Sequence, residues 1–342
     1  LFPQEDADLF FVCISLFSFS KKIVTNKEKY RLLCQTEIDI PIFSQAWWLD
    51  AVCGEKNWDV SLVEANDKIL ASMPYYQPYP GIITMPSYTQ TMGPWQTKES
   101  ANSKYTTLLS KRQAFYKQLI AQLPRFTFFL QNFSYQVTDW LPFYWEGFRQ
   151  TTRYTYILHH IKNHQMIWEN MNSNLRGHIT QAPAKNGIIV KTGVPIDDFL
   201  SIQEKTFLRQ NIKNKENQST LRTLIEVSRE RGQGEIWGGY DPEGRLHAAI
   251  FVVWENFSAY NLAAGGDPAL RKSGAHSLIL WEAIRHVSQY TDTFDFEGSM
   301  IPGVERFFRE FGAIQTPFFT ITKGKLSLLN RACLKIGRII NR

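Results

Sequence analysis

The second half of the chain has an order of elements that few folds can accommodate. Hydrophobic periodicity and turn residues predict three short strands joined by tight turns, then a loop, a helix and a further strand. The expected strands lie at 187–193, 234–240, 246–255, 258–265, 293–298 and 314–321, the helices at 196–210, 221–231, 275–289 and 303–310, and the loop at 266–274. This order predicts a mixed α/β sheet in which an antiparallel meander is followed by a parallel strand. Two neighbouring strands then diverge, and a helix begins at the gap between them.

The first half follows a shorter version of the same pattern. A helix near 45–50, a hairpin at 58–77, a helix at 103–123 and a strand at 126–133 are expected, with a loop rich in Pro, Gly and aromatic residues at 78–97. The 342 residues exceed the ~150 typical of one domain. We therefore expect two modules, each a mixed, mostly antiparallel sheet flanked by helices. They are assigned to 27–150 and 151–325, with an uncertain N-terminal segment at 1–26 and a basic tail at 326–342.

Composition limits the partners, metal sites and membrane segments that the protein can have. The formal charge of +6 favours an anionic partner, without ranking a nucleotide cofactor, a nucleic acid, a phospholipid surface or a phosphorylated glycan precursor. The four cysteines form no CxxC pair and no histidine has metal-ligand spacing, so we expect neither disulfides nor a metal site. The apolar stretch at 9–19 is shorter than the ~20 residues of a membrane span, and acidic residues precede it. We expect a cytoplasmic protein.

A loop suited to phosphate binding precedes the expected helix at 275–289. Residues 271–276 are Arg-Lys-Ser-Gly-Ala-His. The first N–H groups of a helix have no partner within the helix and suit a pyrophosphate. Gly274 lets the backbone approach phosphate oxygens, and Arg271 and Lys272 add positive charge. A helix capped by Ser273 beside a solvated basic pair has the same pattern, so the loop alone leaves both interpretations open.

Together with three other segments, this loop resembles a known superfamily. It is similar to the Arg/Gln-x-x-Gly-x-Gly/Ala loop with which GNAT acyltransferases hold acyl-CoA, with His276 in place of the last small residue. The block at 294–312, where Asp-Phe-Glu-Gly is followed by a short helix ending in Phe-Gly, resembles the FemAB-like branch. The segments LRGHITQAPAKNGI (175–188) and IFSQAWWLDAV (42–52) resemble that branch as well. The resemblance covers roughly residues 40 to 322.

The resemblance implies a tandem GNAT fold with one working site that transfers an acyl or aminoacyl group to an amine. Members that build peptidoglycan cross-bridges use aminoacyl-tRNA, and other relatives use acyl-CoA. The peptidoglycan members carry a lysine three residues before the Phe of the closing Phe-Gly, where this chain has Phe308. We therefore expect acyl-CoA as co-substrate and keep aminoacyl-tRNA as the alternative. The first module has no phosphate loop and is expected to be non-catalytic.

Amine acylation needs a base for the amine proton, an oxyanion stabiliser and a proton for the leaving group. Glu297, at the end of the strand at 293–298, is the expected base, although it can also cap the next helix or pair with Arg306. We expect at most one of Asp295 and Glu297 to face the site. Tyr260 and His276 are secondary candidates, and His276 is expected to be neutral because it lies in the first turn of a helix. Backbone N–H groups of the strand at 258–265 are the expected oxyanion donors.

The remaining candidates bind the two substrates. The expected donor-binding residues are Arg271, Lys272, Ser273, Gly274 and Ala275, and the expected substrate-binding residues are Arg176, Asp295, Arg309, Tyr88 and Trp95. The aromatic residues of the loop at 78–97 either line an acceptor groove or fill the seam between the modules.

We expect an N-acyltransferase that works by direct attack of an amine, without a covalent intermediate. The acceptor is a small molecule or a glycan, peptide or other cell-envelope precursor. No DNA partner is expected, and contact with the inner membrane surface stays open. A non-catalytic scaffold with this fold and an RNA-binding protein are the alternatives.

Overall fold

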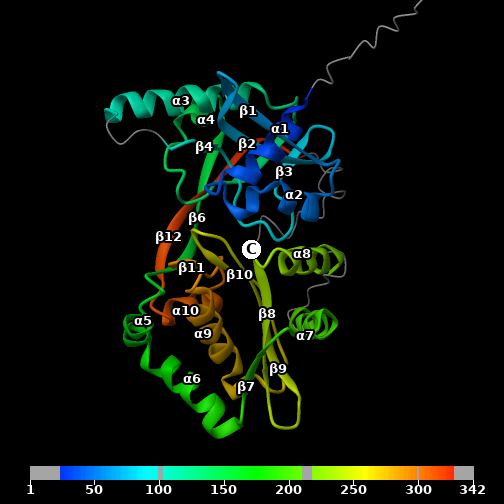
Figure 1. The fold of residues 1–342 in the computed structure, drawn as a ribbon, viewed down its shortest axis with the longest axis vertical. Coiled ribbons are helices and arrows are strands. Elements are labelled where there is room, and N and C mark those ends of the chain that lie inside the picture. Colours follow the sequence, from blue (N-terminus) through cyan, green and yellow to red (C-terminus); the bar gives the residue numbers. More distant parts are fainter. Residues whose placement is uncertain (1–23, 99–102, 210–217, 299, 327–342) are drawn as a thin grey trace, which may run out of the picture.

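The computed structural model of the protein describes residues 24–98, 103–209, 218–298 and 300–326 (Figure 1). The apolar stretch at 9–19 and all but the first residue of the basic tail lie outside these ranges, as does most of the segment at 1–26. In the described part of the chain, every helix is too short or too polar to cross a membrane.

A single mixed sheet of 12 described strands runs the length of the molecule (Figure 1). The strand order is β1-β2-β3-β5-β12-β6-β11-β10-β9-β8-β7, and β4 pairs with β2 outside this path. The strands are β1 (Trp58–Ala65), β2 (Lys68–Tyr79), β3 (Ile82–Thr84), β4 (Trp95–Gln96), β5 (Phe128–Asn132), β6 (Arg149–His159), β7 (Ile189–Thr192), β8 (Gly234–Tyr240), β9 (Leu246–Trp254), β10 (Ala259–Gly266), β11 (Thr293–Asp295) and β12 (Ile314–Gly324).

Helices cover both halves of this sheet. The first half carries α1 (Asn26–Thr36), the short η1 (Ile42–Ser44), α2 (Ala46–Cys53), α3 (Tyr105–Ala121) and α4 (Leu141–Trp145). The second half carries α5 (His164–Asn170), α6 (Ser173–Asn186), α7 (Ile196–Arg209), α8 (Gln218–Glu230), the short η3 (Arg271–Ser273), α9 (Ala275–Val287) and α10 (Pro302–Glu310). The expected α/β fold class, with helices flanking a mixed sheet, is confirmed.

The two halves repeat one pattern about the central strands β6 and β12. In the first half β1, β2 and β3 are antiparallel, and β5 then pairs parallel to β3. In the second half β8, β9 and β10 are antiparallel, and β11 then pairs parallel to β10. The last strand of each half crosses to the other: β6 pairs with β11, and β12 pairs with β5 as well as with β6. The boundary expected after residue 150 falls inside β6.

The strands β10 and β11 diverge as the sequence predicts. Their parallel pairing consists of two residue pairs, Ala259 with Phe294 and Tyr260 with Asp295. Beyond Tyr260, β10 pairs with β9 alone, and a bulge leaves Leu262 without a partner in that register. The strand β11 ends at Asp295, before the expected end at 298. The gap therefore opens directly after the pair formed by Tyr260 and Asp295.

Two apolar clusters fix this arrangement on opposite faces of the second half of the sheet. One cluster joins the sheet to α6, α9 and α10 through buried residues such as Ile179, Ile279 and Phe308. The other joins it to α7 and α8, and it also takes in residues of η1 and α2 from the first half. Figure 1 shows these two groups of helices on either side of β8 and β9. Because the second cluster draws on both halves, it forms the seam between them, where the ring of Phe43 lies 4.7 Å from that of Tyr260.

Candidate functional site

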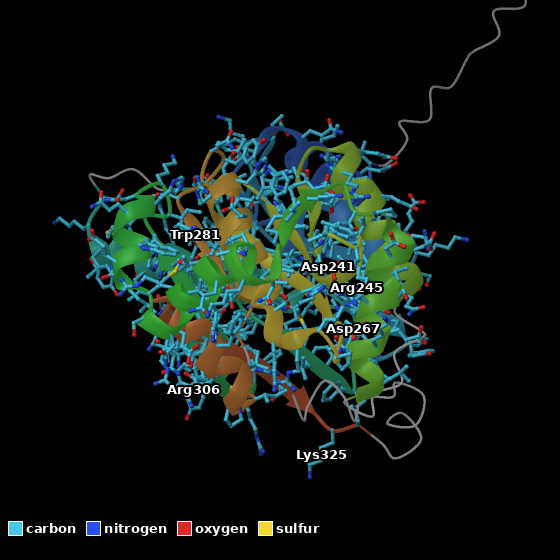
Figure 2. The ribbon with its side chains drawn as sticks, turned by 90° about the horizontal axis from the view of Figure 1, so that it is seen from below. Asp241, Arg245, Asp267, Trp281, Arg306 and Lys325 are labelled. Atoms are coloured by element: carbon cyan, nitrogen blue, oxygen red, sulfur yellow. The ribbon has the colours of Figure 1, made fainter. Side chains whose placement is uncertain are left out.

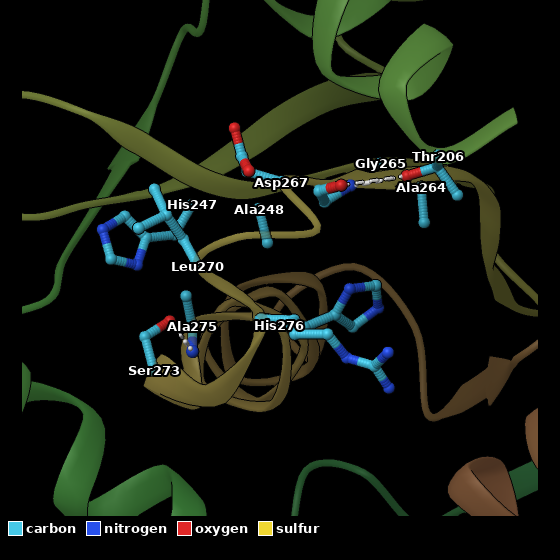
Figure 3. Close-up of a pocket in the computed structure, with 12 residues that line it drawn as sticks. Thr206, His247, Ala248, Ala264, Gly265, Asp267, Leu270, Ser273, Ala275 and His276 are labelled. Carbon is cyan, nitrogen blue, oxygen red and sulfur yellow. Dashed lines mark hydrogen bonds between the residues drawn. The ribbon is translucent and has the colours of Figure 1, made fainter. Parts of the chain in front are cut away.

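A pocket of about 170 Å³ lies where β10 ends and α9 begins (Figure 3). One wall consists of the last residues of β10, including Ala264 and Gly265, and the opposite wall is formed by Ser273, Ala275 and His276. The close-up shows α9 end-on, with its first residues turned toward the pocket. Since the first N–H groups of a helix carry a partial positive charge, this pocket suits an anionic ligand.

The expected donor loop lies at this pocket, and two of its residues also have structural roles. Arg271 and Ser273 line the pocket, and Arg271 and Lys272 are exposed. The Ser273 hydroxyl accepts a hydrogen bond from the Ala275 N–H at 3.3 Å, so it caps one of the free donors of α9. Gly274 has φ +77°, and an added Cβ would lie 2.7 Å from the carbonyl oxygen of His178. Glycine is therefore required here by the approach of α6, whether or not a phosphate binds.

His276 lies at the inner side of the pocket and is half-buried. Its ring packs edge-on against Phe307 of α10, with 5.4 Å between the centroids. Burial lowers the pKa of His276 to about 4, because the charged imidazolium loses hydration. The side chain is neutral at pH 7, as expected, although burial rather than the helix dipole is the cause.

The sequence analysis missed a histidine on the pocket wall. His247 of β9 is buried, and its Nε2 lies 2.9 Å from Asp241 Oδ2, while its Nδ1 has no hydrogen-bond partner among the described residues. Burial alone would raise the pKa of Asp241, but hydrogen bonds from His247 and Arg245 outweigh burial and hold it well below its usual value. Asp241 and Arg245 lie next to each other beside the pocket (Figure 2). The spacing of Asp241 and His247 on either side of a turn was the only sequence feature that could have indicated their contact.

Two carboxyl groups lie together at the point where β10 and β11 part. Asp295 is 1% exposed, and its Oδ1 accepts hydrogen bonds from the Thr155 hydroxyl and, at 2.7 Å, from the Glu297 N–H. Its Oδ2 and the Oε1 of Glu297 are buried without a partner among the described residues. The expectation that at most one of the two faces the site assumed a strand that continues to residue 298, but β11 ends at Asp295. The chain also turns back at Glu297, which has φ +59°.

Both of these carboxyl groups hold their protons more tightly than usual. Burial raises the pKa of Asp295 to about 6, although its hydrogen bonds offset part of the rise. Burial raises the pKa of Glu297 well above its ordinary value, and the charge of Asp295 adds to the rise. Both groups therefore keep their protons to higher pH than exposed carboxyl groups do.

Tyr260 is buried in the seam, and it is paired with a carboxyl group that the sequence analysis did not identify. Its hydroxyl donates to Glu255 Oε1 at 3.0 Å. Glu255 is 9% exposed, and burial raises its pKa to about 7, so its charge changes near neutral pH. Burial raises the pKa of Tyr260 well above 10, which keeps this hydroxyl a donor. Glu255 is the last residue of the expected strand at 246–255, and its position directly after the buried run of β9 was the available signal.

The other four expected substrate-binding residues make contacts of several kinds. The Arg176 guanidinium donates to the carbonyl oxygens of Trp168 and Glu169 and so closes the end of α5. Arg309 is exposed and pairs with Glu305 at 3.1 Å. Tyr88 packs against the seam cluster. Trp95 is buried in the first half, where it borders a different pocket.

The structure thus gathers the expected site residues into two groups. Arg271, Ser273, Ala275 and His276 line the pocket at α9, whereas Tyr260, Asp295 and Glu297 lie at the vertex of the diverging strands and do not line it. The strand β10 connects the groups. Across the described residues, no cluster of His, Cys, Asp or Glu has an arrangement that could hold a metal ion.

Comparisons with known proteins agree with this geometry. The sequence model of the family described as "Acetyltransferase (GNAT) domain" matches residues 191–309, which include both groups. A search among curated proteins gives no match.

Three solved structures have a similar fold. The structure of FemX has 11% sequence identity and a TM-score of 0.63, and the match covers 91% of this chain and 98% of FemX. The structure of L-PGS from Bacillus licheniformis has 9% identity and a TM-score of 0.53, covering 93% of this chain and 98% of that chain. A tandem GNAT protein from the clavulanic acid biosynthesis pathway has 10% identity and a TM-score of 0.50, covering 88% and 94%. Residues 191–309 therefore match a GNAT-type acetyltransferase domain, and the chain as a whole has a fold similar to those of FemX and of a tandem GNAT protein.

Proposed function

We propose that the protein is an N-acyltransferase that moves an acyl group from acyl-CoA to an amine. The observation that carries this proposal is the divergence of β10 and β11 after Tyr260 and Asp295, with the pocket at α9 at the open end. The acceptor is proposed to be a small molecule or a glycan or peptide precursor of the cell envelope.

The donor is proposed to bind with its pyrophosphate at the N-terminus of α9 and its thioester at the vertex. Ala264, on the pocket wall, lies four residues along β10 from Tyr260, which is about 13 Å at the usual rise of a strand. The pantetheine arm of CoA is long enough to cover that distance in the gap. The bulge at Leu262 supplies backbone groups outside the β9 ladder, and an N–H there can stabilise the oxyanion of the reacting carbonyl.

The chemistry is a direct acyl transfer. The amine nitrogen attacks the thioester carbon, the C–N bond forms and the C–S bond breaks, and the CoA thiolate leaves and takes up a proton. Glu297 is proposed to accept the proton that the attacking amine loses, and Asp295 to hold that amine. A cationic amine beside these two groups lowers their pKa values, because it stabilises the carboxylate form. Substrate binding therefore converts Glu297 from an acid into a usable base.

Titration calorimetry with acetyl-CoA and a longer acyl-CoA tests the donor site. We expect saturable binding that Arg271→Ala weakens roughly 10- to 100-fold, since a charge-assisted hydrogen bond contributes about 1.5–3 kcal/mol. Arg285→Ala is the matched control, because Arg285 lies in the last turn of α9, at the end away from the loop, and pairs with Glu282. Equal binding by both variants would exclude the loop as the donor site.

Replacing Glu297 by glutamine tests the chemical step. We expect kcat to fall roughly 10²-fold or more, the usual contribution of a general base, with little change in the dissociation constant of acyl-CoA. Thiol release from acyl-CoA with a panel of amines measures the rate. In the unchanged enzyme the rate should rise with pH, because burial raises the pKa of Glu297 and the base must lose its proton before it can act. A variant as active as the parent would remove Glu297 from the mechanism.

The alternative donor is aminoacyl-tRNA. Phe308 occupies the position of the lysine found in the peptidoglycan members, and it is buried and stacked on Phe296 with 5.0 Å between centroids. That position is therefore part of the apolar core in this chain, which supports acyl-CoA. If no acyl-CoA binds at millimolar concentration, aminoacyl-tRNA or a non-catalytic scaffold becomes the better proposal.

A further inference from the structure

A second pocket, of about 160 Å³, lies in the first half of the chain, apart from the pocket at α9. It is bounded by β4, by the middle of α3 and by the segments that precede α2 and follow β5 (Figure 1). Its lining combines polar and apolar residues, and the polar ones include Asp39, Ser44, Gln96, Arg112, Ser134 and Thr138. The buried Oε1 of Gln96 has no hydrogen-bond partner among the described residues.

Arg112 brings a positive charge to this pocket. Arg112 is half-buried, and within the described ranges its guanidinium forms neither a hydrogen bond nor an ion pair. The carboxylate at the pocket, Asp39, is already paired with Lys98 at 2.6 Å. Burial raises the pKa of the neighbouring Tyr116 to about 12, and the charge of Arg112 opposes part of that rise. A partly desolvated cation without a partner is costly unless a ligand supplies the anion.

Two chain segments that line this pocket also approach the side chains at the vertex of β10 and β11. Ser44 lines the pocket, and the ring of the preceding residue, Phe43, lies 4.7 Å from that of Tyr260 between centroids. Ser134 and Gln136 line the pocket, and Tyr135 between them is close enough to Asp295 and Glu255 that their charges raise its pKa, after burial, to about 12. Two chain segments therefore have the pocket on one side and the proposed acyl-transfer site on the other.

We infer that this pocket binds an oxyanion of the acceptor, a phosphate or a carboxylate, and that Arg112 recognises it. The inference rests on the proposed function, because it assigns the pocket to the acceptor of that reaction. It defines the substrate class as an amine that also carries an anionic group. Arginine suits this role, since its planar guanidinium matches the geometry of phosphate and carboxylate oxygens.

The test is a titration with inorganic phosphate, and with acetate in a second arm, at constant ionic strength. Binding is followed by calorimetry and by the indole N–H resonance of Trp95, which lines the pocket and is identified with Trp95→Phe. We expect saturable binding that shifts this resonance and that Arg112→Gln weakens at least tenfold. Lys117→Gln is the matched control, because Lys117 lies on the same helix but contacts Trp145. If acetate binds as strongly as phosphate, the anionic group of the acceptor is a carboxylate. If acetate binds more weakly than phosphate, that group is a phosphate.

Two further measurements separate this inference from the proposed donor site. Phosphate can also bind at α9, so the titration is repeated in the Arg271→Ala variant, where binding at Arg112 should persist. Acyl-CoA binding by Arg112→Gln should equal that of the parent. Phosphate binding that is lost in Arg271→Ala and kept in Arg112→Gln, or the absence of any binding at millimolar anion, overturns the inference. Neither result depends on whether acyl-CoA binds.

Discussion

Replacing Gly298 by alanine is expected to lower the free energy of unfolding by about 4 kcal/mol or more. The residue has φ +58°, and an added Cβ would lie 2.2 Å from the carbonyl oxygen of Tyr154 and 2.6 Å from the Cα of Thr155. These are backbone atoms of the central strand β6, so no side-chain rotation relieves the overlap. Strain at a left-handed position adds about 1 kcal/mol or more. Urea unfolding followed by circular dichroism measures the change.

Gly303→Ala is the control for this substitution. Gly303 lies in α10, close in sequence to Gly298, and no heavy atom lies within 4 Å of an added Cβ. Alanine should leave stability unchanged or raise it by up to about 1 kcal/mol, because it favours the helix. If Gly298→Ala unfolds at the same urea concentration as Gly303→Ala, β6 does not approach Gly298 as closely as described.

Replacing Asp295 by asparagine is expected to raise the free energy of unfolding by about 2–3 kcal/mol at pH 8. Burial raises the folded-state pKa of Asp295 to about 6, from 3.8. The folded protein therefore binds the proton more tightly than the unfolded chain, and stability falls as pH rises from about 4 to about 6. Asparagine removes this penalty and keeps an oxygen that can accept from Thr155 and from the Glu297 N–H. The gain should be small at pH 4 and complete above pH 7, as measured by urea unfolding across pH.

Asp241→Asn is expected to change stability at pH 8 in the opposite direction to Asp295→Asn. The pKa of Asp241 is lowered by its hydrogen bonds to His247 and Arg245, so its carboxylate stabilises the fold at neutral pH, and that contribution disappears as pH falls. Asparagine should therefore destabilise the protein at pH 8 and matter less near pH 3. If both variants change stability in the same direction at pH 8, burial does not determine the state of Asp295.

Local sequence signals predicted the elements that build the pocket at α9. The turn residues between the three meander strands and the Gly-Ala start of α9 are short-range features, and the structure contains each of them. Tertiary packing changed where one helix begins. Ser44 would cap the next helix in isolation, but it lies in η1, and α2 begins at Ala46 with Gln45 as its N-cap.

The residues that escaped prediction depend on contacts between distant segments. Glu255 is buried by η1 and bonded to Tyr260 only in the folded chain. The ring of His247 likewise pairs with Asp241 across a turn. Arg176 matched a family pattern, but its guanidinium is used by the end of α5. In each case the deciding partner is set by the tertiary fold, which periodicity and motif spacing do not encode.

Because β6 and β12 each pair with strands of the other half, the chain is difficult to divide into two independent fragments. A fragment that ends at residue 150 would lose β12 from the side of β5, and its sheet would end in an unpaired edge prone to aggregation. A fragment that begins at 151 would lack the first residues of β6, including Gln150, which pairs with Ile321. Neither copy of a duplicated unit can then be deleted without damage to the other. A first half without a catalytic role of its own would still be retained, because it supplies β5 as a partner of β12 and part of the seam cluster around Tyr260.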